Sequence, residues 1–276
     1  MFKRRMPRLV LLRWRSNHNP RMSSAKATAL EAERPSPRNR MYISNWTSAI
    51  LAVLPNLPDI HGGDDKLHQI LQRWHMDVHL AYDHDPQRHY HAVSHLTAMW
   101  AAYADWIAAG ITRLNARDEL ILFCAVLFHD FVYDPRATGG QNERDSAKRW
   151  LDCAAEIQLP ADIVEDVNSL ILATIKHQLP DDGNPNPNSL PLFLDLDLEV
   201  LSRPREDYFV YASQIRAEYA HVPDDAFRVG RCAVLRHLMQ GDIYFTEYAR
   251  TSLQESARAN MQAELEQLTN AVGSDS

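Results

Sequence analysis

The sequence predicts an all-α protein, a bundle of about eight to nine helices in which a single apolar helix is central. Apolar residues recur at helical spacing through most of the chain after residue 41, and no stretch alternates apolar and polar residues for long enough to form a sheet. The run at 120–128, LILFCAVLF, is apolar on every side and is typical of a helix at the centre of a core. With 276 residues, 45% of them apolar, the chain can bury such a core.

The first 40 residues differ in composition from the rest. They hold eleven Lys or Arg and only two acidic residues, whereas the whole chain has a net charge of −7. This basic arm fits a transit peptide, a disordered tether for nucleic acid or membrane, or a start codon placed upstream of Met41. We favour the last interpretation or plain disorder. The expected organisation is therefore an arm over 1–40 and a single helical domain over 41–276.

Spacings of three and four between apolar residues mark the expected helical segments in chain order. They lie near residues 43–54, 64–82, 93–107, 117–130, 147–154, 159–177, 189–201, 205–221, 223–240 and 247–270. Asp64 suits a helix N-cap, Gly110 suits the position after a helix end, and Ser189 with Pro191 is typical of an N-cap and first turn. The polar stretch 134–145 is expected to be a loop.

Cysteine use and hydropathy restrict the compartment. The apolar run at 120–128 is too short to cross a bilayer, which takes about 20 residues. The three cysteines are an odd number and have no CxxC spacing, so neither a disulfide framework nor a zinc ribbon is indicated. We expect no membrane span and a reducing, cytoplasmic location.

Histidines and one aspartate stand at positions that could converge. His91 and His95 are four residues apart, so they share one face of a helix. His129 and Asp130 end the central apolar helix, and His177 ends a later one. Neutral imidazoles together with carboxylates are ligands that a divalent transition metal or magnesium accepts. The pattern favours a metal site, although any one histidine is more often a surface residue or a hydrogen-bonded core residue.

Two further pairs need separate interpretations. Asp195 and Asp197 lie in an apolar run, where carboxylates are costly without a cation or hydrogen-bond donors. One of the two could instead be a cap or the partner of an arginine. His75 and His79 share the spacing of the first histidine pair, but they flank an ordinary apolar stripe, so we expect them to be structural.

Five motifs, taken in order, resemble the HD-domain superfamily of metal-dependent phosphohydrolases, a family named for its His-Asp pair. The resemblance covers about residues 45–268 and is closest to a bacterial group of predicted HD phosphohydrolases. The motifs are YHAVSH at 90–95, LFHDFVYD at 127–134, NERDSA at 142–147, ATIKH at 173–177 and LDLDLEVL at 194–201.

The resemblance implies an HD-domain-like helical bundle with a metal centre. Carried over residue by residue, the family pattern makes His95, His129, Asp130 and Asp197 the ligands of a divalent ion, which could be Mn, Co, Ni, Mg, Fe or Zn. Asp195 is the competing choice for the last ligand.

The resemblance also implies roles around that centre. His91 is similar to the family histidine that protonates a leaving oxygen, and Glu143, expected on the loop, to a carboxylate that orients or deprotonates water. His177 would bind phosphate or a second metal. Basic residues beside the motifs are candidates to contact phosphate: Lys176, Lys148 and Arg144.

The function expected from the resemblance is hydrolysis of a small-molecule phosphate ester, of a nucleotide or a related compound. The alternative is a module that retains the metal and binds a nucleotide or second messenger without turnover, and a third possibility is a helical scaffold with a vestigial site. The sequence has no P-loop, no GxGxxG and no base-reading motif, so we expect no specific nucleic-acid partner. A homo-oligomer is compatible with the sequence.

Overall fold

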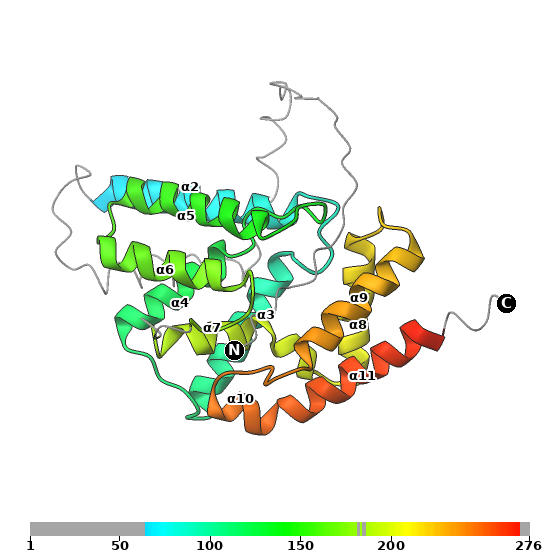
Figure 1. The fold of residues 1–276 in the computed structure, drawn as a ribbon. Helices are drawn as coiled ribbons and strands as arrows, with labels where there is room; N and C mark the ends of the chain where they lie inside the picture. The colour runs from blue at the N-terminus through cyan, green and yellow to red at the C-terminus, as the bar shows by residue number, and fades with distance from the viewer. Residues whose placement is uncertain (1–63, 181–182, 184–185, 271–276) are drawn as a thin grey trace. The chain divides into compact units, whose positions relative to one another are not determined.

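The fold is that of a computed structural model, which describes residues 64–180, 183 and 186–270 (Figure 1). The basic arm at 1–40 and the expected first helix at 43–54 lie outside the described residues. Within the described part, secondary structure consists of ten α-helices and one short 3-10 helix, so the all-α class is confirmed and the expected eight to nine helices were too few. The elements are α2 (Asp64–Asp83), α3 (Val93–Ala108), α4 (Ala116–Phe128), α5 (Gln141–Ile157), α6 (Ala161–Ala173), α7 (Ser189–Asp197), η2 (Glu199–Ser202), α8 (Arg205–Glu218), α9 (Asp224–Leu238), α10 (Glu247–Ser252) and α11 (Gln254–Asn270).

Helix α4 is the centre of the core, as its apolar run predicts. Every residue from Leu120 to Phe128 is buried, and α4 packs against α3, α5, α6 and α7. The helix begins at the Asn115 cap, whose side chain accepts a hydrogen bond from the Asp118 backbone N–H. It ends at Phe128, so His129 and Asp130 lie on the turn that follows instead of in the last helical turn.

The other helices pack around α4 through their apolar stripes. Helices α2, α5 and α6 lie side by side in Figure 1, and α5 contacts both of its neighbours. In α3, Trp106 is buried at 6% exposure, whereas the next residue, Ile107, is 40% exposed. Gly110 follows α3 with a φ of +71°, and the next N–H, of Ile111, returns to the Trp106 carbonyl at 2.8 Å, which confirms the expected helix stop.

Further expected boundaries were wrong. Helix α6 ends at Ala173, so His177 lies four residues beyond the helix and does not end it. Helix α5 begins at Gln141, so Glu143 lies in its first turn and not on a loop. The cap of α7 is Asn188, and Ser189 is the first helical residue. The last expected segment is divided at Leu253 into α10 and α11.

The start of α5 depends on a glycine. Gly140 has a φ of +79°, a conformation that residues with a side chain rarely adopt. A Cβ atom there would lie 2.8 Å from Cγ2 of Ile175, so a residue with a side chain at position 140 would force Ile175 to move. The close approach of Gly140 to Ile175 brings the first turn of α5 next to the segment that carries His177.

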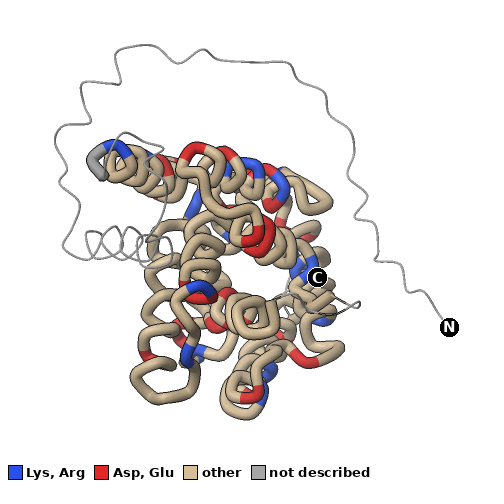
Figure 2. Tube along the Cα trace, turned by 90° about the vertical axis from the view of Figure 1, so that its left-hand side faces the viewer, with Lys and Arg blue, Asp and Glu red and all other residues tan. Residues whose placement is uncertain are grey.

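Charged residues of both signs are interspersed along the described helices (Figure 2). None of these helices combines the length and the apolar character needed to span a bilayer.

Candidate metal centre

Three side chains from three helices meet at one point. His95 comes from α3, His129 follows α4, and Asp197 ends α7, and their donor atoms all lie within 4.8 Å of one another. His95 Nε2 is 3.0 Å from Asp197 Oδ1 and 3.2 Å from His129 Nε2. The two histidines are 4% and 1% exposed. This group could hold a metal ion.

The hydrogen bonding of His129 tests whether a cation fits. Its Nδ1 lies 3.0 Å from the Val126 carbonyl oxygen, which can only accept, so Nδ1 carries a hydrogen. A neutral His129 ring then has a lone pair on Nε2, which lies 3.1 Å from Asp130 Oδ2 and 3.5 Å from Asp197 Oδ1. A lone pair facing two carboxylates in a buried site requires a cation between them, either a proton or a metal. Two imidazole nitrogens and a carboxylate suit a divalent transition metal.

The electrostatics of the group agree with this requirement. Burial alone would lower the pKa of His129, but Asp130 and Asp197 outweigh it and raise that pKa well above its usual value. Burial would raise the pKa of Asp197, but hydrogen bonds from His129, His177 and His95 hold it well below its usual value. For Asp130, too, the histidines, His129 first, outweigh burial and lower the pKa. Both carboxylates are therefore ionised and favour a positive charge at the centre.

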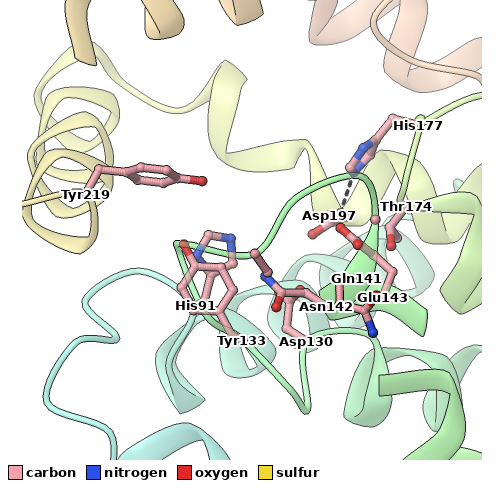
Figure 3. A pocket seen from close by; sticks show the side chains of 12 residues that line it. His91, Asp130, Tyr133, Gln141, Asn142, Glu143, Thr174, His177, Asp197 and Tyr219 are labelled. Carbon is pink, nitrogen blue, oxygen red and sulfur yellow. Dashed lines mark hydrogen bonds and ion pairs between the residues drawn. The ribbon is translucent and has the colours of Figure 1, made fainter. Parts of the chain in front are cut away.

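Asp130 and His177 lie at the edge of the group. Asp130 Oδ2 is 3.1 Å from His129 Nε2 and 4.0 Å from His95 Nε2, so it lies beside the three-residue group. His177 Nε2 lies 2.8 Å from Asp197 Oδ2, the contact drawn as a dashed line in Figure 3. His177 has a φ of +46°, which is unusual for a residue with a side chain and is often found at functional sites. Asp197 thus uses one oxygen toward His95 and the other toward His177.

Asp195 has a different role. It is fully buried and accepts hydrogen bonds from the backbone N–H groups of Phe245 and Thr246 at 2.7 and 2.8 Å, and from the Thr246 hydroxyl at 2.6 Å. Burial nevertheless raises its pKa to about 6. Of the two aspartates that the sequence left open, Asp197 joins the histidines and Asp195 anchors the segment before α10.

A polar pocket of about 250 Å³ adjoins the group (Figure 3). Glu143, on the first turn of α5, is part of its wall. The lining residues are His91, Asp130, Tyr133, Ala137, Gly140, Gln141, Asn142, Glu143, Thr174, His177, Asp197 and Tyr219.

The basic residues proposed to contact phosphate do not line this pocket. Lys176 is exposed. Lys148 pairs with Asp145 at 2.6 Å, and Arg144 donates to the Gly139 carbonyl at 2.8 Å.

His91 lies on the pocket wall, where Glu218 holds it. His91 Nδ1 is 2.7 Å from Glu218 Oε2, and the ring stacks on Tyr133 with 4.2 Å between centroids. Burial would lower the pKa of His91, but Asp130 and Glu218 raise it above its usual value. Burial likewise opposes ionisation of Glu218, yet the contact with His91 leaves its pKa at about 2. The imidazole is therefore fixed in orientation and holds a proton readily.

Glu218 and Arg88 were not predicted from the sequence. Glu218 is 2% exposed and also accepts a hydrogen bond from the Tyr133 hydroxyl at 2.8 Å. Arg88 is 9% exposed and donates to the carbonyls of His91, Asp130 and Phe131 at 3.2, 2.7 and 2.9 Å. It therefore ties the segment of His91 to the turn of Asp130. Neither residue stands in a local pattern that could have revealed it, because each is one of many charged residues on a helix or loop.

The pair His75 and His79 stays outside the group. His75 is 9% exposed, and neither of its ring nitrogens has a hydrogen-bond partner among the described residues. His79 Nδ1 lies 3.1 Å from Asp83 Oδ2. His91 precedes the first residue of α3, so it does not share a helix face with His95 as the spacing predicted. It nevertheless lies on the pocket wall, whereas His75 and His79 do not.

The residues themselves carry the functional interpretation. Comparisons of this chain with protein-family models, with curated proteins and with solved structures found no match in any of the three.

Proposed function

We propose that this protein is a metal-dependent phosphohydrolase that hydrolyses a small-molecule phosphate ester, of a nucleotide or a related compound. The observation that carries the proposal is the meeting of His95, His129 and Asp197 beside a polar pocket whose wall holds His91. The ordered motifs that resemble the HD superfamily support the same activity. The absence of disulfides among the three buried cysteines fits a cytoplasmic location.

The three-residue group would hold the metal, with Asp130 and His177 near enough to add ligands or to orient them. A divalent ion bound there supplies Lewis acidity toward water and toward a phosphoryl oxygen. Asp197 keeps its orientation because His177, which is outside the three-residue group, contacts its second oxygen. Such outer contacts raise the precision and the affinity of a metal site.

Two carboxylates on the pocket wall would act on the attacking water. Asp130 lies at the edge of the metal group and Glu143 stands on the first turn of α5. Asp130 would orient the water, because its lowered pKa makes it a weak base, and Glu143 would accept a proton from the water as the water oxygen forms a bond to phosphorus. General-base assistance of this kind contributes about 10²- to 10⁴-fold to rate.

His91 would act on the leaving group. Its Nδ1–H donates to Glu218, so the proton on Nε2 of the imidazolium is the one available in the pocket. As the bond between phosphorus and the ester oxygen breaks, its electron pair stays on that oxygen, which takes the Nε2 proton. The products are orthophosphate, from a monoester, and the free alcohol. His91 is left neutral and regains its proton from solvent, and the carboxylate that took a proton from the water releases it to solvent.

Elemental analysis beside a phosphate-release assay tests the proposal. Purified wild-type protein is compared with Asp197→Asn and with the matched control Asp195→Asn, two positions earlier on the same helix. The substrates are a panel of nucleotides and an aryl phosphate with added Mn, Co, Ni, Mg, Fe or Zn. We expect near-stoichiometric metal and phosphate release in the wild type, loss of both in Asp197→Asn, and retention of metal in Asp195→Asn. Absence of metal in the wild type would refute the proposal, and metal without turnover would favour a binding module.

A further inference from the structure

The charge of the pocket wall restricts what can bind in it. Of the lining residues, Asp130, Glu143 and Asp197 are acidic, His91 and His177 are imidazoles, and none among those described is Lys or Arg. Two of the carboxylates face the candidate metal group. Glu143 has no basic partner on the wall and gives this side of the pocket a negative charge.

Four basic residues near the pocket are engaged elsewhere, and Lys176, beside His177, is exposed and does not line the pocket. The Arg88 guanidinium is buried behind the wall against three carbonyl oxygens. Arg203 is paired with Glu199 at 2.7 Å. Lys148 and Arg144 are held on the outer side of α5, by Asp145 and by the Gly139 carbonyl. None of the four lines the pocket.

We infer that the pocket selects substrates that carry a single phosphoryl group and discriminates against nucleoside di- and triphosphates. This inference rests on the proposed function. One phosphoryl group at the metal group would meet the cation together with His91 and His177. A second or third phosphate would extend along Glu143 and the tyrosines, where an anion has no basic partner and meets a like charge.

The size and polarity of the pocket also favour a substrate with a single phosphoryl group. A volume of about 250 Å³ is below the range of about 300–1,000 Å³ typical of drug-sized ligands, so a compact ester fits better than an extended polyphosphate. Several neutral polar groups on the wall are already committed: Asn142 bonds the Asp134 backbone at both of its side-chain atoms, and the Tyr133 hydroxyl donates to Glu218. Tyr219 points toward the other lining residues from one side of the pocket in Figure 3 and would contact the organic part of the ester.

The test compares phosphates that differ only in charge and length. Adenosine mono-, di- and triphosphate share the organic part, so the ratio of their kcat/KM values measures the effect of the added phosphates. Two variants are measured with the wild type. Ala137→Lys adds a cation at a lining position that has no side-chain hydrogen bond to lose, and Thr138→Lys adds the same charge at the next residue, which is exposed and does not line the pocket.

Calorimetry supplies a readout that does not depend on turnover. Binding of orthophosphate and of tripolyphosphate is measured for the same three metal-loaded proteins, with metal content determined before and after. Chelation of the ion by tripolyphosphate would be common to all three proteins, so the difference between the lysine variants isolates the charge of the wall.

We expect the wild type to hydrolyse the monophosphate at least about tenfold more efficiently than the triphosphate. Ala137→Lys should reduce the ratio of the two kcat/KM values by at least about fivefold. It should also raise the affinity for tripolyphosphate relative to orthophosphate by at least about fivefold, whereas Thr138→Lys should change neither quantity. The inference would be overturned if the triphosphate were hydrolysed as efficiently as the monophosphate, or if the two lysine variants had equal effects. Neither outcome would contradict the proposed phosphohydrolase activity. Failure of every ester to react would overturn the proposed function, and the calorimetric comparison would still decide the charge selectivity.

Discussion

Glu218 contacts His91 at two atoms across 127 residues of sequence: Oε1 accepts the His91 backbone N–H at 2.9 Å, and Oε2 lies 2.7 Å from Nδ1. The same carboxylate accepts the N–H groups of His89 and Tyr90 at 2.9 and 2.7 Å. The end of α8 therefore positions both the backbone and the ring of His91. This arrangement fixes which ring nitrogen is available to a ligand.

Glu218→Gln should impair the proposed acid without removing the metal. The amide cannot accept all of the bonds that Glu218 accepts, and the pKa of His91 falls when the carboxylate is lost. We expect kcat to fall about 10²-fold and the alkaline limb of the pH–rate profile to move to lower pH, because His91 must be protonated to act. The measurement is a pH–rate profile together with metal analysis.

Glu264→Gln is the control for Glu218→Gln. Glu264 is also buried and pairs with Arg231 at 2.8 Å, away from the lining of the pocket. The Glu264→Gln substitution should lower the free energy of unfolding and leave the pH–rate profile unchanged. An unshifted profile in Glu218→Gln would remove Glu218 from the mechanism.

His129→Ala should abolish metal binding. A metal that binds only the native state stabilises it by about 2.7 kcal/mol at a hundredfold excess over Kd, which corresponds to about 5–10 °C in Tm for a chain of this size. A chelator should therefore lower the Tm of the wild type by that amount and leave the Tm of His129→Ala unchanged. Differential scanning calorimetry measures both, and full metal occupancy in the variant would contradict the assignment.

Asp195→Asn should weaken the fold and spare the metal. The amide NH₂ would face the N–H of either Phe245 or Thr246, because both carboxylate oxygens are acceptors in the native structure. We expect a loss of about 2 kcal/mol in the free energy of unfolding, measured in urea. Metal stoichiometry should equal that of the wild type, and its loss would place Asp195 in the metal centre after all.

Glu143→Gln should separate turnover from metal binding. The side chain lies on the pocket wall and is not one of the three residues that form the metal group. We expect kcat on the best ester to fall by about 10²-fold or more with full metal retained. Steady-state kinetics and elemental analysis of one preparation give both values, and unchanged kinetics would exclude Glu143 as the base.

His75 should make the fold sensitive to acid. Burial lowers its pKa from 6.5 to about 4, and nearby His79 acts in the same direction. The unfolded chain therefore binds this proton more tightly than the folded protein does. The free energy of unfolding is therefore highest above about pH 6.5, where the ring is neutral in both states, and it decreases as the pH falls toward 4. By pH 5 the decrease due to His75 is about 2 kcal/mol.

The variant His75→Leu isolates this effect. Urea unfolding at pH 7 and pH 5 should show a loss of stability between the two pH values that is about 2 kcal/mol smaller in the variant than in the wild type. Equal losses in the two proteins would show that His75 does not titrate in this range.

The sequence alone was sufficient to predict the fold class. It also singled out the histidines that the structure places in the three-residue group or on the pocket wall, which are His91, His95, His129 and His177. Helical spacing of apolar residues is a local property, so the amino-acid order by itself reveals the stripe from Leu67 to Tyr82 and the all-apolar run of α4. The stop at Gly110 was equally local. The start of α5 was not, because the positive φ of Gly140 and its contact with Ile175 depend on how α5 meets the α6 region, and Glu143 was therefore placed on a loop.

Only the tertiary structure decided which polar residues work together. Asp195 and Asp197 have the same chemistry and nearly the same sequence surroundings, yet one is buried against Thr246 and the other meets His95. Glu218 could not be anticipated, since its partner His91 lies 127 residues earlier and no periodic pattern records such a pairing. Spacing along a helix determines which face a side chain occupies, but the neighbours on that face are set by packing between helices that are distant in sequence.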